Sequence, residues 1–115
     1  EKKVDKKMKE DVLIGFQAGK NVISADNGKK LDEVVAYLNA NPKAKIELVG
    51  HIDKMEIKLS GLANKRISAV DKYLMSERIK KERIKQTNVG ADKPLDSSGS
   101  KENREKNMVV EVKFN

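Results

Sequence analysis

The sequence contains no cysteine and no tryptophan, and it has only four aromatic residues, Phe16, Tyr37, Tyr73 and Phe114. Without cysteine the chain can form no disulfide and offers no thiolate to a metal or a substrate. A core with so few rings must be built from Val, Ile, Leu and some Met. The length of 115 residues fits one domain, which can bury roughly two thirds of the surface that its unfolded chain exposes.

Long apolar runs are missing as well. No stretch approaches the ~20 apolar residues that a membrane-spanning helix needs, so we expect no transmembrane segment in this chain. The net charge is +7, from 25 basic and 18 acidic residues, but Lys and Glu alternate along most of the chain, which is typical of a solvated surface. The sequence has neither an aromatic platform nor a known reader motif, so we expect no nucleic-acid partner.

Candidate catalytic and metal-ligating residues are few. His51 is the only histidine, and one histidine without cysteine does not supply the several ligands of a metal site. Neither Ser60 nor Ser68 lies in a motif that would make it a nucleophile activated by His51. The glycines lack the spacing of a phosphate-binding loop. We therefore expect a binding domain rather than an enzyme, with no metal and no cofactor.

The hydrophobic pattern predicts elements in the order strand, helix, strand, helix, strand, strand. Residues 1–10 are almost wholly charged and are expected to be a linker or lead-in, with the domain itself over residues 11–115. The predicted strands cover residues 11–16, 45–53, 83–89 and 108–114.

Two amphipathic helices are predicted between these strands. The first follows a loop at residues 17–30, carries an apolar stripe from Leu31 to Leu38 and ends before Pro42. The second runs from about Ser60 to Glu77, and a flexible loop is predicted at residues 90–106. Strands joined by a single helix should be parallel neighbours in the sheet.

Asp53 and Arg66 have the clearest chemical reason to hold a ligand. Asp53 ends the second predicted strand, and Arg66 lies within the apolar stripe of the helix that follows. An arginine in such a stripe is costly unless an anion meets its guanidinium. Its planar fork suits a ligand carboxylate, while Asp53 could accept hydrogen bonds from an ammonium group. The two residues could equally pair with each other and join helix to strand, and their spacing leaves both interpretations open.

Residues spread from Val12 to the C-terminus resemble the motifs of one known family. The matches, in chain order, are Gly50-His51-Ile52-Asp53 on G-H-T-D, Leu62, Arg66 and Val70 on L-S-x-x-R-A-x-x-V, Arg83-Ile84, Gly90 and Pro94 on R-I…G…P, and Asn107, Val110 and Glu111 on N-R-R-V-E. By their order and spacing the chain resembles the OmpA-like C-terminal domain, the peptidoglycan-binding module of outer-membrane proteins, peptidoglycan-associated lipoproteins and flagellar motor stators.

The resemblance implies an α+β sandwich in which a mixed sheet carries its helices on one face. It also implies non-covalent binding of the diamino-acid-containing stem peptide of peptidoglycan, with the ligand-holding aspartate and arginine at Asp53 and Arg66. We include His51, Leu62 and Asn107 as ligand-binding residues because they stand on the same motifs. The implied location is the periplasm, in an outer-membrane-associated protein anchored to the wall, with other envelope proteins as further partners.

Several positions depart from the family pattern. The connection after Asp53 is two residues shorter than usual, and polar family residues are replaced by Ile52, Leu59, Ala63 and Met108-Val109. A pocket that loses surrounding donors loses affinity or changes its ligand. The alternative hypothesis is therefore a degenerate OmpA-like domain that no longer binds peptidoglycan and serves a structural or protein-interaction role.

Overall fold

The computed structural model describes residues 10–96 and 104–115. The order of strands and long helices is the predicted one, with three short 3-10 helices (η) added. In chain order the elements are β1 (Val12–Gly15), α2 (Ala25–Ala40), β2 (Ile46–His51), η1 (Lys54–Glu56), α3 (Leu62–Ser76), η2 (Lys81–Arg83), β3 (Ile84–Gly90), η3 (Glu105–Asn107) and β4 (Val109–Phe114).

The four strands form one mixed sheet in the order β1-β4-β2-β3. β2 and β3 are parallel neighbours, as predicted for strands joined by a helix. The same prediction was wrong for β1 and β2, because β4 lies between them and pairs antiparallel with both. Val110 and Val112 on β4 are fully buried, so the last strand takes a central place. Its alternating pattern does not distinguish a central strand from an edge strand.

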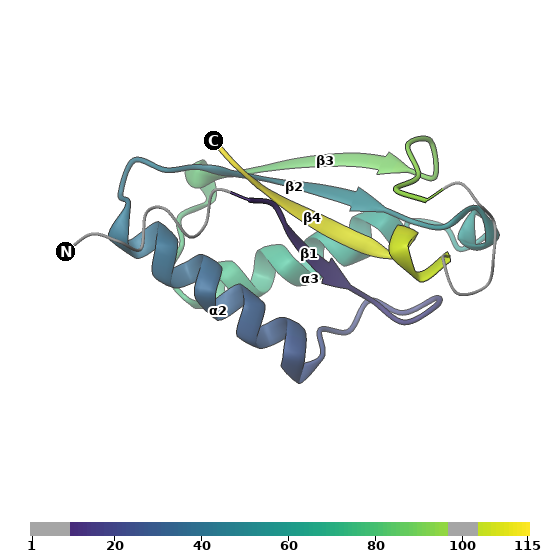
Figure 1. Ribbon diagram of the computed structural model, residues 1–115, viewed down its shortest axis with the longest axis horizontal. Coiled ribbons are helices and arrows are strands. Elements are labelled where there is room, and N and C mark those ends of the chain that lie inside the picture. The colour runs from purple at the N-terminus through teal and green to yellow at the C-terminus, as the bar shows by residue number, and fades with distance from the viewer. Residues whose placement is uncertain (1–9, 97–103) are drawn as a thin grey trace.

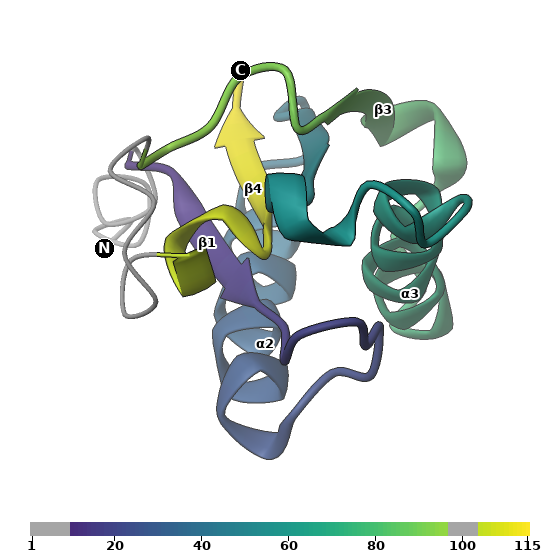
Figure 2. The same ribbon diagram turned by 90° about the vertical axis from the view of Figure 1, so that its right-hand side faces the viewer.

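Helices α2 and α3 pack on the same face of the sheet (Figure 1), and a second view shows them side by side beneath it (Figure 2). This confirms the predicted α+β arrangement with the helices on one face. The core lies between the two layers and is aliphatic, as the scarcity of aromatic residues requires. Its fully buried members include Ile14, Leu31, Leu38, Leu48 and Leu74.

Helix α2 begins six residues before its predicted apolar stripe, so the predicted loop over residues 17–30 was wrong in its second half. Ser24 is the N-cap, and its hydroxyl accepts a hydrogen bond from the Asn27 backbone N–H. The Asn27 side chain also donates to the Gly15 carbonyl at 2.8 Å. This bond ties the first turn of α2 to the end of β1.

Two predictions fall at least partly outside the described part of the chain. The charged lead-in predicted at residues 1–10 lies outside it except for Glu10. The flexible loop predicted at residues 90–106 lies outside it at residues 97–103. Its described portions include the end of β3 and the start of η3.

Gly50 allows α3 to approach β2 closely. A Cβ atom at this position would lie 2.6 Å from Ile67 Cδ1 and Cγ1, and 3.0 Å from the Ala63 carbonyl oxygen. These distances are shorter than van der Waals contact, so a larger residue would force the Ile67 side chain or the helix itself to shift. The close approach holds the first turns of α3, and with them Arg66, against the end of β2.

We expect Gly50→Ala to lower the free energy of unfolding by about 1–3 kcal/mol, because overpacking of a close interface typically costs this much. Gly15→Ala on β1 is the matched control, since a Cβ there would meet nothing within 4 Å. Urea unfolding of both variants measures the difference. Wild-type stability of Gly50→Ala would contradict the close approach of α3 to β2.

Candidate functional site

The five residues predicted to bind ligand gather at the end of the sheet where β2 stops. His51 is the last residue of β2, Asp53 is the N-cap of η1, and Asn107 ends η3. Leu62 and Arg66 belong to the first two turns of α3. All five side chains are buried, and Arg66 is 0% exposed. The five residues named from the sequence therefore lie at the same end of the sheet.

Every N–H group of the Arg66 guanidinium donates a hydrogen bond within the protein. Nε donates to the Lys20 carbonyl at 2.9 Å, while Nη1 and Nη2 donate to the carbonyls of His51 and Gln17 at 3.3 and 3.2 Å. The two remaining donors go to the Glu56 carboxylate, at 2.9 and 2.6 Å. The guanidinium also lies over the Phe16 ring, 5.5 Å from its centroid. The predicted need of Arg66 for a carboxylate is therefore met inside the chain.

Glu56 belongs to this buried cluster and was not predicted from the sequence. Besides the two Arg66 donors, its carboxylate accepts the backbone N–H groups of Gly19 at 2.7 Å and Asp53 at 2.9 Å. Burial raises the pKa of this carboxyl, but the hydrogen bonds from Arg66, Gly19 and Asp53 lower it more, so the pKa lies below its ordinary value of 4.5. The spacing Asp53-x-x-Glu56, typical of a capping box, was the signal that could have identified it.

Asp53 does not pair with Arg66, so the interpretation that the two residues bind each other was wrong. One Asp53 carboxylate oxygen accepts the Met55 backbone N–H at 2.9 Å, and the other accepts the Asn107 side-chain amide at 3.0 Å. Asn107 in turn bonds the backbone of Asp96, as donor to its carbonyl and acceptor from its N–H. This network joins the end of β2 to the segment that precedes β4.

The side chains of His51 and Leu62 lie beside these polar groups without bonding to them. The His51 carbonyl accepts from Arg66, but its imidazole Nε2 lies 2.8 Å from Glu111 Oε1 on β4. Its Nδ1 is buried with no hydrogen-bond partner in the described part of the chain. Leu62 packs with Ile52 and Ala63 in a small apolar cluster. In the structure Leu62 is thus a packing residue, and the His51 ring is hydrogen-bonded to Glu111 on β4.

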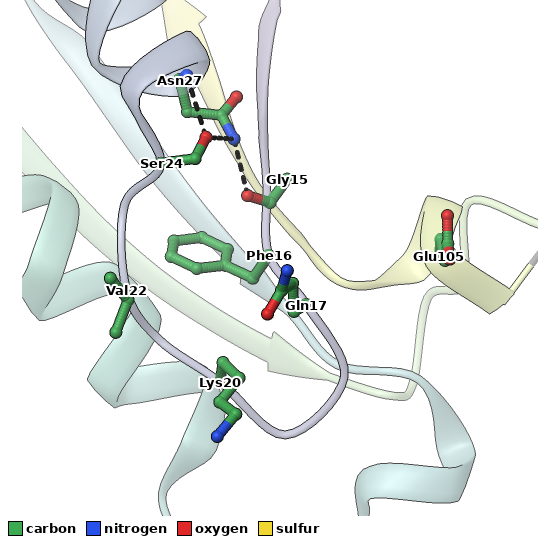
Figure 3. A pocket seen from close by; sticks show the side chains of 8 residues that line it. All are labelled: Gly15, Phe16, Gln17, Lys20, Val22, Ser24, Asn27 and Glu105. Carbon is green, nitrogen blue, oxygen red and sulfur yellow. Dashed lines mark hydrogen bonds between the residues drawn. The ribbon is translucent and has the colours of Figure 1, made fainter.

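Two hollows adjoin the site. One, of about 670 Å³, is bordered by Gly15, Phe16, Gln17 and Lys20, among others, and none of the five predicted residues lines it (Figure 3). The other, of about 420 Å³, is lined by the His51–Glu111 pair and by residues of β3. Neither Arg66 nor Glu56 lines either hollow, so their ion pair is not part of these two surfaces.

Over residues 10–96 and 104–115, no group of three or more His, Cys, Asp or Glu side chains is placed to hold a metal ion. Within the same ranges, no helix has both the length and the apolar character needed to cross a membrane.

A mixed four-stranded sheet with two helices on one face matches the fold of OmpA-like domains. The sequence profile of the OmpA family matches residues 15–108, which is most of the chain. The chain therefore belongs to the OmpA family. No curated protein sequence matches it significantly.

Solved structures of OmpA-like domains superpose on this fold. The peptidoglycan-associated lipoprotein of Burkholderia pseudomallei has a TM-score of 0.83 at 17% identity, over 90% of this chain and 89% of that one. The C-terminal domain of Helicobacter pylori MotB has a TM-score of 0.78 at 22% identity, over 90% and 84%. The OmpA-like domain of FopA1 from Francisella tularensis has a TM-score of 0.77 at 19% identity, over 91% and 70%. At these identities the likeness concerns the fold.

We expect Glu56→Ala to lower the free energy of unfolding by about 3–5 kcal/mol, because it leaves the Arg66 charge buried without its partner. Glu33→Ala, on the exposed side of α2, is the control and should change stability by no more than about 0.5 kcal/mol. Chemical denaturation of both variants gives the comparison. Similar values for the two would show that the Arg66–Glu56 pair contributes no more than a surface charge.

The lowered pKa of Glu56 predicts a dependence of stability on pH. Its ionisation stabilises the fold above the ordinary pKa of 4.5, taken for the unfolded chain, and this contribution is lost as the pH falls through the lower folded pKa. In that window the unfolded state binds more protons, so the free energy of unfolding rises with pH. The stability difference between wild type and Glu56→Gln should therefore shrink from about pH 7 to about pH 3. A constant difference would contradict the lowered pKa.

Proposed function

We propose that this domain binds peptidoglycan non-covalently, through the diamino-acid-containing stem peptide, and so attaches an envelope protein to the cell wall. The proposed domain spans residues 11–115 and acts in the periplasm, as part of an outer-membrane-associated protein. No catalytic step belongs to the proposal. Membership of the OmpA family supports it, as does the likeness of the fold to a lipoprotein whose name describes it as peptidoglycan-associated.

One observation carries the choice of ligand chemistry. The Arg66 fork lies at the position where the family resemblance places the arginine that holds the stem peptide, and it already grips a carboxylate, that of Glu56. A diamino acid presents both a carboxylate and an ammonium group, and the Asp53 carboxylate lies in the same cluster. The ligand carboxylate would thus meet Arg66 and its ammonium group would meet Asp53, each of opposite charge.

A second candidate function is favoured by a different observation. All five N–H groups of Arg66 are already used and its side chain is 0% exposed. If the Arg66 N–H groups never exchange these acceptors for a ligand, the domain would serve a structural or protein-interaction role without binding peptidoglycan. The two candidates differ in whether any muropeptide reaches Arg66.

Titration of the 15N-labelled domain with muropeptides that carry different diamino acids tests the choice. We expect chemical-shift changes at Gly19, Asp53 and Arg66 when a muropeptide binds. Asp53→Asn and Arg66→Lys should each lower the affinity at least about tenfold, because a hydrogen bond to a charged group contributes about 1.5–3 kcal/mol. Asp92→Asn and Arg78→Lys change exposed residues of the same types and should bind as wild type does.

The variants must first show the dispersed spectrum of a folded domain, so that loss of binding is not loss of fold. Purified sacculi provide the second readout, by co-sedimentation. Unchanged spectra with every muropeptide, together with no co-sedimentation, would reject peptidoglycan binding in favour of the structural or protein-interaction role.

A further inference from the structure

The Glu56 carboxylate lies in a cradle of four hydrogen-bond donors. Two belong to the Arg66 guanidinium, and the others are the backbone N–H groups of Gly19 and Asp53, at distances between 2.6 and 2.9 Å. None of the four donors belongs to Glu56 itself. Any other carboxylate in the same place would receive the same bonds. The cradle is thus selective for a carboxylate group and not for this particular side chain.

Glu56 is the only hydrogen-bond acceptor of Arg66 in the described part of the chain that is a side chain. The other acceptors are main-chain carbonyls of Gln17, Lys20 and His51, whose positions the backbone determines. Glu56, by contrast, lies on the connection between β2 and α3, where it alone among residues 54–61 is buried. Its neighbours Met55 and Ile57 are 64% and 62% exposed. Rotation of one side chain and of a surface segment would empty the cradle.

We propose that Glu56 is a built-in competitor that occupies the carboxylate site of this domain and must be displaced by the carboxylate of the wall peptide. This inference rests on the proposed function and adds its regulation. The free domain is then mostly closed, and its apparent affinity equals the intrinsic affinity multiplied by the fraction of molecules in which Glu56 has left the cradle. Residue 56 thereby sets the strength of wall attachment.

Calorimetric titration with a disaccharide tripeptide that carries meso-diaminopimelate as its third residue tests the competition. We expect Glu56→Gln to bind at least about tenfold more tightly than wild type. In this variant a neutral amide replaces the carboxylate, and the charge-assisted hydrogen bonds that it loses are roughly twice as strong as neutral ones. The fraction of molecules in which residue 56 has left the cradle therefore rises. Glu33→Gln on α2 is the matched control and should bind as wild type does. Equal or weaker binding by Glu56→Gln, in a folded variant, would overturn the proposal.

Chemical rescue of Glu56→Ala tests the cradle without any wall fragment. Sodium acetate should raise the unfolding midpoint of this variant by several degrees over sodium chloride at equal ionic strength, because acetate binds only the folded state. Wild type and Glu33→Ala should respond equally to both salts. If Glu56→Ala is unfolded in chloride, acetate should restore the folded spectrum. No acetate-specific effect would overturn the proposal.

The two experiments separate the competitor from the proposed function. Rescue by acetate without muropeptide binding by wild type or Glu56→Gln rejects wall binding and supports a carboxylate cradle closed by Glu56. Muropeptide binding of equal strength in wild type and Glu56→Gln supports wall binding and rejects the competitor. Tighter binding by Glu56→Gln together with acetate rescue supports both.

Discussion

The buried ion pair between Arg66 and Glu56 is the interaction on which this end of the domain depends. Removal of two charges from water is costly, and the cost is offset only when the geometry is good and every remaining donor and acceptor is satisfied. Arg66 meets this condition by bonding to the connection after β1, to the end of β2 and to Glu56. A single side chain on α3 thus determines how three other segments lie.

The polar network extends from this pair through Asp53 and Asn107 to the segment before β4. The connections at this end are therefore joined by hydrogen bonds, whereas the core between sheet and helices is aliphatic. The two regions respond differently to sequence change. The core needs only apolar volume of the right size, but loss of one member of the polar network leaves another member buried and unsatisfied. Changes in one surface connection can thus alter the site while the fold persists.

Much of the fold could be predicted from local pattern, because apolar spacing reports which face of a helix or strand is buried. The order of the strands within the sheet could not be predicted in this way, since the placement of β4 between β1 and β2 depends on pairing between distant segments. The location of the site was predicted from the cost of burying Arg66 in an apolar stripe. The partner of Arg66 was not predicted, because Asp53 and Glu56 both lie a short distance before Arg66 in the sequence. Only the three-dimensional path of the chain determines which of the two carboxylates reaches the guanidinium.

The central place of β4 has a consequence for how the domain is made. β1 and β2, formed from the first half of the chain, have no hydrogen bonds to each other, and the C-terminal strand connects them. Pairings of such long sequence separation slow folding, since the intervening chain must be ordered before they form. During synthesis the sheet cannot close until β4 is available. The edges of β1 and β2 that face β4 therefore remain unpaired in the nascent chain until β4 has been made.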